Sequence, residues 1–396
     1  MVIYPALRLK KHEEKRLQKG HIWIYSNEVD IAHSPFKNFQ PGQLAQVERS
    51  DGKVLGLAYV NPHTLLCARL LVSGNAPVFG PKVIEQRIKQ ALDLRQALFP
   101  QPYYRLIYGE SDALPGLIVD RYGEVLVLQL TTAGMEALKG PVLAALQHII
   151  QPTAILLRND HGMRELEGLT KYVEAGFGTV PERLELIENG VRFCIQPWQG
   201  QKTGWFYDHR DSRAQLARFV KGKRVLDLFS YVGGWSVQAA VFGATEVYAV
   251  DSSAAALAML EHNAQINQVA DRVHCWEDDV FKRLKLLLDS MVTFDMVILD
   301  PPAFIKKRKD AQAGLTAYYR INEMALRLLA ANGILISCSC SSHLSREDLL
   351  ELVSQAGLKA GRRTQLIAQG HQGPDHPIHP AIPETEYLKA LFFRVI

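Results

Sequence analysis

Two apolar segments of the chain each carry an acidic residue at or near their end, a pattern typical of strands that present a carboxylate to a ligand. The first, Arg224–Trp235, reads as a buried strand, a turn with Gly233 and Gly234, and the start of a helix. The second, Phe294–Pro302, is a strand that ends on Asp300 before two prolines. The first could hold an adenosyl group, and the second could present a planar amine or base to it. Together they indicate methyl transfer from S-adenosylmethionine.

Carboxylates fall at the ends of four successive predicted strands: Asp227, Asp251, Asp279 with Asp278 beside it, and Asp300. Ligands of an open parallel sheet bind beyond these ends, near the point where strand order reverses. Asp251 is placed to accept bonds from both ribose hydroxyls, and Asp279 from the adenine amino group. Alternatively, these two residues cap the helices that follow them. A dinucleotide is disfavoured because no G-x-G-x-x-G pattern follows the first strand.

The segment before the first of these strands, residues 201–213, could wall the methionine end of the cofactor. Its aromatic residues stand beside Asp208, Arg210 and Arg213. By itself, such a segment is more often an amphipathic approach to a helix.

A cysteine at a strand end suggests which atom is methylated. Carbon 5 of cytosine becomes nucleophilic only after a thiolate adds at carbon 6. Cys338 closes the fifth predicted strand, beside the strand of Asp300 in the usual order, although free cysteines are also common as small buried residues. Pro301 and Pro302 follow Asp300, so this segment could bond to the edge of a base while Phe304 stacks on its face.

The composition is that of a globular protein without a disulfide framework. The 396 residues suffice for two or three domains, and the five cysteines include no C-x-x-C. The net charge of +4 permits an RNA partner without arguing for one. No apolar run approaches the roughly 18 residues of a membrane helix, and no secretory signal is recognisable at the N-terminus, which predicts a cytoplasmic protein without a membrane partner.

One group of residues near the C-terminus has the types that bind metals. His371, Asp375, His376 and His379 are interleaved with glycine and proline. They are more simply explained as a rigid loop facing the substrate, so no metal is expected.

The chain divides into three regions that differ in the order of their predicted strands and helices. Residues 1–75 contain short strands separated by turns, which predicts a small β-barrel. Residues 76–183 predict a compact α+β unit, and residues 184–396 an α/β domain with a parallel sheet covered on both faces. In this third region we expect strands near 224–229, 246–251, 273–277, 294–299 and 333–338, helices near 235–242, 254–267, 280–290, 315–331 and 345–356, and a last strand at 387–394, antiparallel at or near the sheet edge.

Motifs along essentially the whole chain match one family. They are Gly20–Ser26 and Asn61-Pro62; Gly109–Gly116 and Val119–Gly123; and Lys202–Gly204, Tyr207-Asp208, Arg210, Phe229–Tyr231, Gly233-Gly234, Asp278–Phe281, Asp300–Pro302, Ser337–Ser339, Asp375–Pro377 and Tyr387–Lys389. With these motifs the chain resembles the bacterial large-subunit (23S) rRNA cytosine-5 methyltransferase I family.

The resemblance implies a PUA RNA-binding domain, a central mixed α/β domain and a Rossmann-like class I methyltransferase domain. It also implies S-adenosylmethionine as cofactor, 23S rRNA as partner, Cys338 as nucleophile and Asp300 as a further catalytic residue. The matched motifs add Tyr207, Phe229, Ser230 and Tyr231 to the expected cofactor contacts.

Two departures bear on the target base. Members often carry lysine after the double proline, where this chain has Ala303. Enzymes with two cysteines place one near that position, so a covalent mechanism here would use a single cysteine. Related enzymes of this architecture methylate guanine at nitrogen 7 without a nucleophile, and a non-catalytic RNA-binding assembly factor is a further alternative. Whether the protein forms a homodimer stays open.

Overall fold

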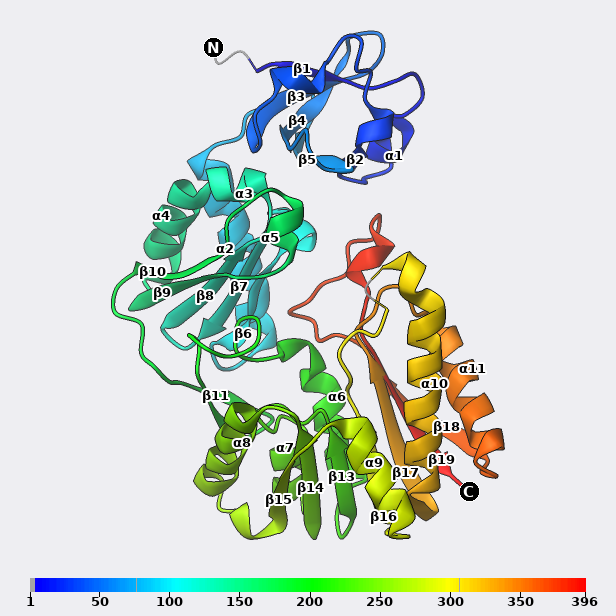
Figure 1. Cartoon of the computed structure of the whole chain (residues 1–396). Helices are drawn as coiled ribbons and strands as arrows, with labels where there is room; N and C mark the ends of the chain where they lie inside the picture. Colours follow the sequence, from blue (N-terminus) through cyan, green and yellow to red (C-terminus); the bar gives the residue numbers. More distant parts are fainter. Residues whose placement is uncertain (1–3, 76, 306) are drawn as a thin grey trace. The chain divides into compact units, whose positions relative to one another are not determined.

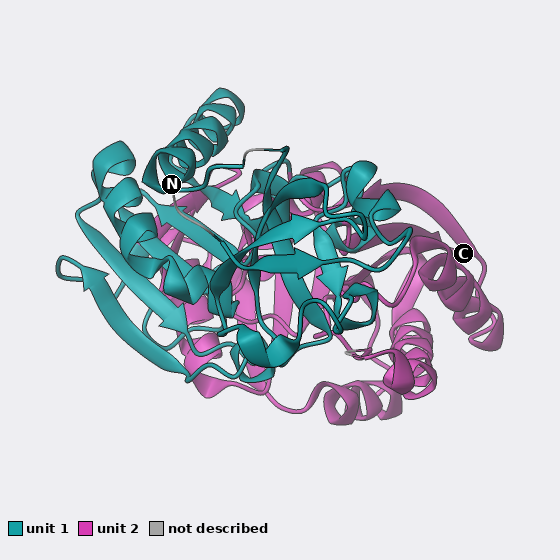
Figure 2. Cartoon of the chain, turned by 90° about the horizontal axis from the view of Figure 1, so that it is seen from above, with its two compact units in different colours: residues 1–184, 196–205, 374–385 teal, residues 185–195, 206–373, 386–396 magenta. Residues whose placement is uncertain are grey.

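A computed structural model describes residues 4–75, 77–305 and 307–396 of the chain (Figure 1). Residues 1–3, 76 and 306 lie outside this part. Residues 1 and 76 are the first positions of the predicted β-barrel and of the predicted α+β unit. The chain forms two compact units, coloured separately in Figure 2. Unit 1 comprises residues 1–184, 196–205 and 374–385, and unit 2 comprises residues 185–195, 206–373 and 386–396.

The first sheet of unit 1 has five short strands in the order β1-β3-β4-β5-β2. Their bounds are β1 Ala6–Arg8, β2 Trp23–Tyr25, β3 Gln43–Glu48, β4 Val54–Val60 and β5 Leu66–Ser73, with the helix α1 at Lys15–Gln18. Leu7, Val47 and Ala58 are fully buried in its core. The strand β1, which pairs parallel with β3, was not expected from the sequence, because three residues are too short to show a pattern.

The second sheet of unit 1 also has five strands, in the order β10-β9-β8-β7-β6. Its elements are α2 Pro81–Leu98, β6 Tyr103–Tyr108, β7 Leu117–Tyr122, β8 Val125–Leu130, α3 Ala133–Ala137, α4 Lys139–Ile150, β9 Ala154–Asn159, α5 Met163–Leu166 and β10 Tyr172–Phe177. Every residue of β8 and β9 is buried, as expected of central strands. The helix α3 packs against β4 of the first sheet at Gly134, where a Cβ would lie 2.0 Å from the Tyr59 ring.

Unit 2 is built on a seven-stranded sheet in the order β15-β14-β13-β16-β17-β19-β18. The strands are β13 Arg224–Leu228, β14 Glu246–Asp251, β15 Val273–Glu277, β16 Phe294–Leu299, β17 Leu329–Ser339, β18 Thr364–Gly370 and β19 Lys389–Val395. The helices are α6 Arg210–Ala214, α7 Ser236–Val241, α8 Ala254–Ile266, α9 Val280–Asp289, α10 Ala311–Arg327 and α11 Arg346–Lys359. A hairpin of β11 (Leu184–Glu188) and β12 (Val191–Ile195) precedes the sheet.

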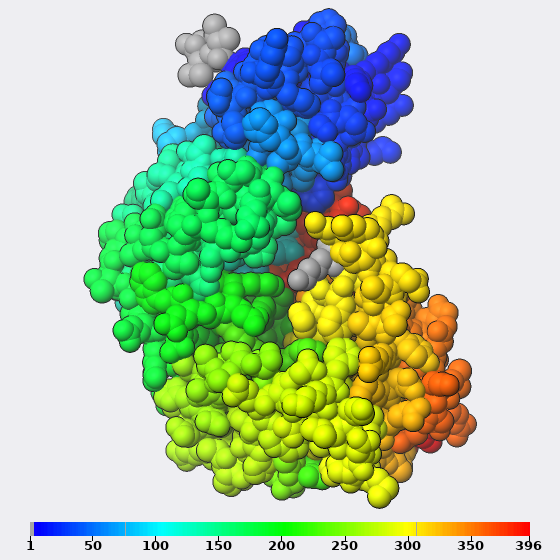
Figure 3. Space-filling model, in the orientation of Figure 1, coloured from blue at the N-terminus to red at the C-terminus, as the bar shows by residue number. Residues whose placement is uncertain are grey.

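Strand order reverses between β13 and β16, which are parallel neighbours at the centre of the sheet. Both strands are almost wholly buried, as are the last seven residues of β17, so helices and loops cover both faces. In Figure 3 the yellow-green to yellow residues of α9 and α10 hide the strands behind them. The α/β fold class predicted for this region is therefore confirmed.

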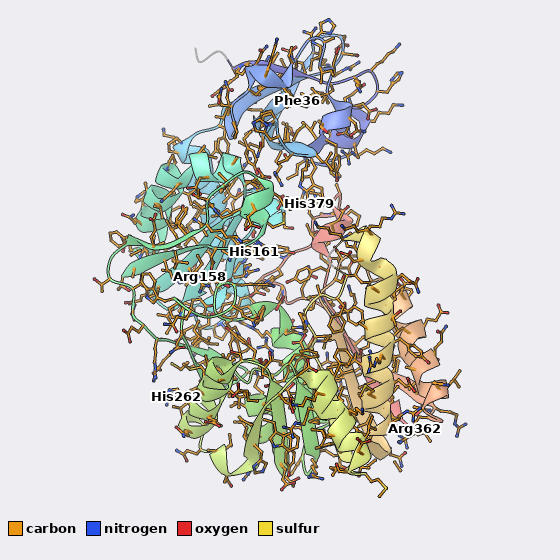
Figure 4. The ribbon with its side chains drawn as sticks, viewed as in Figure 1. Phe36, Arg158, His161, His262, Arg362 and His379 are labelled. Carbon is orange, nitrogen blue, oxygen red and sulfur yellow. The ribbon has the colours of Figure 1, made fainter. Side chains whose placement is uncertain are left out.

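The C-terminal part of the sheet differs in detail from the expectation. The predicted last strand is β19, which is antiparallel to both neighbours and lies one strand in from the edge. The edge strand β18 was missed because its side chains are mostly exposed and show no apolar alternation. Arg362, labelled in Figure 4, anchors the start of β17 by donating to the carbonyl oxygens of Leu329 (2.8 Å) and Ala330 (2.9 Å).

Candidate active site

Polar atoms without a partner lie at the carboxyl end of β13. The carboxylate of Asp227 is fully buried and accepts a hydrogen bond from the Ser236 hydroxyl through Oδ2. Its Oδ1 and the hydroxyl of buried Ser230 have no hydrogen-bond partner among the described residues. Burial raises the pKa of Asp227 to about 7, an effect that the Ser236 bond opposes and the charge of Asp300 increases. Such buried atoms normally have a partner, so they mark a place for a polar ligand.

The backbone after β13 is held in an unusual conformation. Phe229 and Tyr231 have φ of 65° and 49°, the left-handed region that side chains larger than glycine rarely adopt. Two bonds fix this loop: Ser230 N donates to Val250 O (3.0 Å) and Tyr231 N to Asp251 Oδ2 (2.9 Å). A Cβ on Gly233, whose φ is +90°, would lie 2.7 Å from Leu260 Cγ. The loop thus has the local strain and close packing typical of a ligand site.

The acids at the ends of β14 and β15 have different surroundings. The oxygens of Asp251 accept the backbone N–H groups of Tyr231 and Ser253, both at 2.9 Å, and Ser253 itself caps α8. Asp279, by contrast, is the N-cap of α9 and accepts from Lys282 N at 2.9 Å. The capping alternative therefore describes Asp279 but not Asp251.

Asp278 lies between the end of β15 and α9. Its carboxylate oxygens lie 3.3 Å from Lys282 Nζ and 3.1 Å from Arg283 Nη2. Desolvation would raise the pKa of Asp278, but the bond to Lys282 and the two cations hold it below its ordinary value. The carboxylate is therefore charged at neutral pH.

The segment that was expected to wall the cofactor packs on a buried carboxylate, that of Glu188 in β11. Arg213 donates to Glu188 Oε1 at 2.6 Å, and Arg210 Nε lies 3.9 Å from Oε2. The guanidinium of Arg210 also lies over the ring of buried Tyr207, 5.2 Å from its centroid. Asp208 accepts from the hydroxyl of Tyr387 at 2.5 Å. These contacts hold the segment in place within unit 2, and Glu188 was not foreseen from the sequence.

Cys338 and Asp300 are brought together by the pairing of β16 with β17, in which Leu299 lies opposite Ser337. A third residue joins them. His209 Nε2 lies 3.2 Å from Asp300 Oδ1, and Trp235 Nε1 donates to Asp300 Oδ2 at 3.0 Å. A nitrogen of His209, an oxygen of Asp300 and the sulfur of Cys338 all lie within 4.8 Å of one another. The arrangement brings a thiol, an imidazole and a carboxylate together.

Sequence reasoning missed His209, although it stands between two predicted cofactor residues, Asp208 and Arg210. The signal that could have found it is a titratable imidazole inside a segment already expected to line the site. Its ring packs edge-on against Trp235, with 5.5 Å between centroids. Its Nδ1 is buried without a hydrogen-bond partner among the described residues.

Charge and burial set the protonation of this cluster. Burial, together with the carboxylates of Asp300 and Asp227, raises the pKa of the Cys338 thiol well above its ordinary value. Desolvation would raise the pKa of Asp300 as well, but His209 and Trp235 outweigh it and hold that pKa low. The resting cluster is therefore a neutral thiol beside a charged carboxylate.

The residues expected to bind the target base lie directly after β16. Pro301 is buried and Pro302 exposed. Phe304 is half-buried, and its ring packs against Tyr318 (4.8 Å between centroids) and Phe229 (6.3 Å). Base stacking by Phe304 stays a prediction.

The metal-like residues near the C-terminus are divided between the units. His371 belongs to unit 2, whereas Asp375, His376 and His379 belong to unit 1. Asp375 and His376 are buried and bonded to each other at 2.9 Å, and Asp375 also accepts from the backbone N–H of Arg105 at 3.0 Å. They stabilise unit 1 by these contacts, and the absence of a metal stays a prediction.

Comparison with known proteins matches two stretches of the chain to known families. A family described as S-adenosylmethionine-dependent methyltransferase matches residues 171–394, and a PUA-like domain family matches residues 7–73. A Klebsiella pneumoniae protein named ribosomal RNA large subunit methyltransferase I is 34% identical over 399 residues, covering 100% of this chain and 99% of the relative. A Shewanella frigidimarina protein of the same name is 36% identical over 394 residues, covering 98% and 99%.

Solved structures show the same fold. A SAM-dependent methyltransferase from Streptococcus mutans superimposes with a TM-score of 0.84 at 20% identity, covering 98% of this chain and 100% of that one. The methyltransferase SMU.776, solved with SAH, also gives a TM-score of 0.84, at 21% identity and the same coverage.

The fold and the site together define an S-adenosylmethionine-dependent methyltransferase with an N-terminal PUA-like domain, and S-adenosylmethionine is its cofactor. The unpartnered polar atoms of Asp227 and Ser230 fit such a ligand. More narrowly, the chain belongs to the ribosomal RNA large subunit methyltransferase I family. None of the helices in its described part is both long and apolar enough to cross a membrane.

Proposed function

We propose that this protein methylates carbon 5 of a cytosine in 23S rRNA through a covalent adduct with Cys338. The substrate class follows the name that its relatives carry, ribosomal RNA large subunit methyltransferase I. The observation that carries the chemistry is the Cys338 sulfur within 4.8 Å of the Asp300 carboxylate, at the carboxyl ends of two central strands.

The bound cofactor supplies an electrophilic methyl group on a sulfonium. Asp227 and Ser230 offer it buried polar atoms, Asp251 the ribose contact, and Asp278 and Asp279 the adenine contact. Phe229, Tyr231 and Gly233 shape the loop between them. Tyr207, Asp208, Arg210 and Arg213 would line the methionine end. This assignment places the donor beyond the carboxyl ends of β13, β14 and β15, where ligands of such sheets bind.

The chain's own groups would activate the base. Asp300 accepts a hydrogen bond from the exocyclic amine of a cytosine turned out of the RNA stack, and Pro301, Pro302 and Phe304 confine its ring. The sulfur of Cys338 adds to carbon 6, and the electron pair of the 5,6 double bond moves to carbon 5, which accepts the methyl group. Loss of the carbon 5 proton then restores the double bond and releases the thiolate.

The test uses Cys338→Ala with labelled cofactor and unmodified 23S rRNA. Cys194→Ala is a matched control, because Cys194 is also a buried thiol of unit 2 but lies on β12. Loss of methyl transfer in Cys338→Ala alone supports the covalent mechanism, and full retention rejects it. A 5-fluorocytidine-substituted RNA should also remain attached to wild-type enzyme and not to Cys338→Ala.

Nucleoside mass spectrometry decides the target base. Label in 5-methylcytidine supports the proposal, whereas label in 7-methylguanosine would replace it with nitrogen methylation. A protein that binds no cofactor in calorimetry would instead act as an RNA-binding assembly factor.

A further inference from the structure

The proposed reaction needs a thiolate, but the cluster around Cys338 opposes one. Cys338 is only 1% exposed, and the carboxylates of Asp300 and Asp227 both act against a negative sulfur. Arg213 is the nearby cation that favours it, and Cys340 adds a further opposing charge when ionised. A buried thiol in such surroundings attacks only when a neighbouring group takes its proton as the bond to carbon forms.

His209 has the position and the free lone pair for this task. Its Nε2 faces Asp300 Oδ1 at 3.2 Å, which assigns the proton of a neutral ring to Nε2 and leaves the lone pair on Nδ1. Nδ1 is buried and without a partner among the described residues. The ring is held by Trp235, which both packs against it and binds the second oxygen of Asp300.

We propose that His209 is the general base that deprotonates Cys338, with Asp300 as the carboxylate that orients its ring and stabilises the imidazolium. This inference rests on the proposed cytosine-5 function. One imidazole nitrogen of His209 lies within 4.8 Å of the Cys338 sulfur, a separation that one bridging water or a small movement on substrate binding would close for proton transfer.

Every proton that moves in this step has a donor and an acceptor. The S–H bond of Cys338 breaks as a sulfur–carbon 6 bond forms, and the proton bonds to the free imidazole nitrogen of His209. When the carbon 5 proton has left to solvent and the sulfur is expelled with its bonding pair, the imidazolium returns its proton to the thiolate. Asp300 keeps its negative charge throughout, as an orienting carboxylate should.

The test measures the addition of Cys338 to carbon 6 of the cytosine in the absence of methyl transfer. Reversible attack at carbon 6 lets the hydrogen on carbon 5 exchange with water, so tritium release from RNA labelled at carbon 5 reports it in the absence of a methyl donor. We expect His209→Gln to lower this exchange by about 10²- to 10⁴-fold, the usual contribution of a general base. The dependence of exchange on pH should differ between His209→Gln and wild type, which a merely structural role of His209 would leave unchanged.

Two further variants separate a base from a structural role. In His209→Gly, added imidazole should restore exchange, whereas an unrescued loss at unchanged cofactor affinity would overturn the proposal. His262→Gln is the matched control, because His262, labelled in Figure 4, lies on α8 of the same unit and is not part of the cluster of His209, Asp300 and Cys338, so this variant should exchange like wild type.

The outcomes distinguish this inference from the function on which it rests. If His209→Gln exchanges the carbon 5 hydrogen at the wild-type rate and Cys338→Ala does not exchange it, His209 is rejected as the base and the covalent mechanism is retained. Methyl transfer that survives in Cys338→Ala would reject both.

Discussion

The carboxylate of Asp251, at the end of β14, accepts the backbone N–H of Tyr231, in the loop after β13, at 2.9 Å. This bond joins the two neighbouring strand ends and helps to hold Tyr231 at a φ of 49°. One acid therefore fixes the shape of the loop at which we expect the ribose of the cofactor to bind.

Asp251→Ala should weaken cofactor binding strongly. Hydrogen bonds to a charged group contribute about 1.5–3 kcal/mol each, which corresponds to roughly 10- to 150-fold in Kd. Calorimetry with S-adenosylmethionine measures the change. Asp271→Ala, on an exposed turn before β15, should bind like wild type, and equal affinity in both variants would remove Asp251 from the site.

Asp227 should make the cofactor-free protein less stable as pH rises. Its pKa is near 4 when unfolded and about 7 in the folded state, mainly through burial. The folded state therefore binds more protons between these values, and the free energy of unfolding falls as pH rises from about 4 to about 7. Asp227→Asn, which keeps an acceptor for Ser236, should remove this slope in denaturant titrations. An unchanged dependence of the free energy of unfolding on pH in this variant would show that the Asp227 carboxyl group is already ionised at low pH in the folded wild-type protein.

Gly233→Ala should cost both stability and cofactor affinity. The new Cβ would lie 2.7 Å from Leu260 Cγ and 2.9 Å from Val237 Cγ2, at a φ of +90°. Overpacking of this kind costs about 1–3 kcal/mol, in addition to the backbone strain. Gly222→Ala is the matched control, because its φ is +73° but no atom lies within 4 Å of the Cβ. Thermal unfolding should therefore show a clearly larger loss for Gly233→Ala.

A buried ion pair should determine the stability of unit 1. Arg69 of β5 lies 3.2 Å from Glu167, which also accepts from the side chain of Asn61 at 2.8 Å. Removing one partner of a buried pair costs about 3–5 kcal/mol, so Glu167→Ala should lower the unfolding temperature markedly. Glu185→Ala breaks the exposed pair with Arg192 and should cost under about 1 kcal/mol. Similar shifts in both variants would contradict this difference.

Removal of metal ions should leave methyl transfer unchanged. Within the described part of the chain, His209, Asp300 and Cys338 are the three groups of suitable type that lie close enough to share one ion. Asp300 Oδ2 already accepts a hydrogen bond from Trp235 and its Oδ1 is paired with His209, and transfer from a sulfonium requires no Lewis acid. Activity after treatment with EDTA and dialysis, compared with untreated enzyme, measures this. A loss restored by one metal would assign the cluster a different role.

The sequence alone determined the central strands of unit 2 and the acids at their ends. Strands such as β13 and β16 are continuous apolar runs, and a carboxylate or glycine directly after such a run is a local signal. For the same reason the sequence indicated a methyl donor site around Asp227, Gly233 and Asp300. The pairing of β16 with β17 follows from the usual strand order, which also placed Cys338 near Asp300.

Tertiary structure decided which of these groups lie next to one another. His209 meets Asp300 because the segment before β13 packs on the ends of β16 and β17, and no local pattern encodes that contact. The buried carboxylate of Glu188 and the exposed edge strand β18 were missed for related reasons: the first depends on distant arginines, and the second lacks an apolar alternation. Asp251 and Asp279 look alike in sequence. Only the structure shows that Asp279 is the N-cap of α9, whereas α8 is capped by Ser253 and not by Asp251.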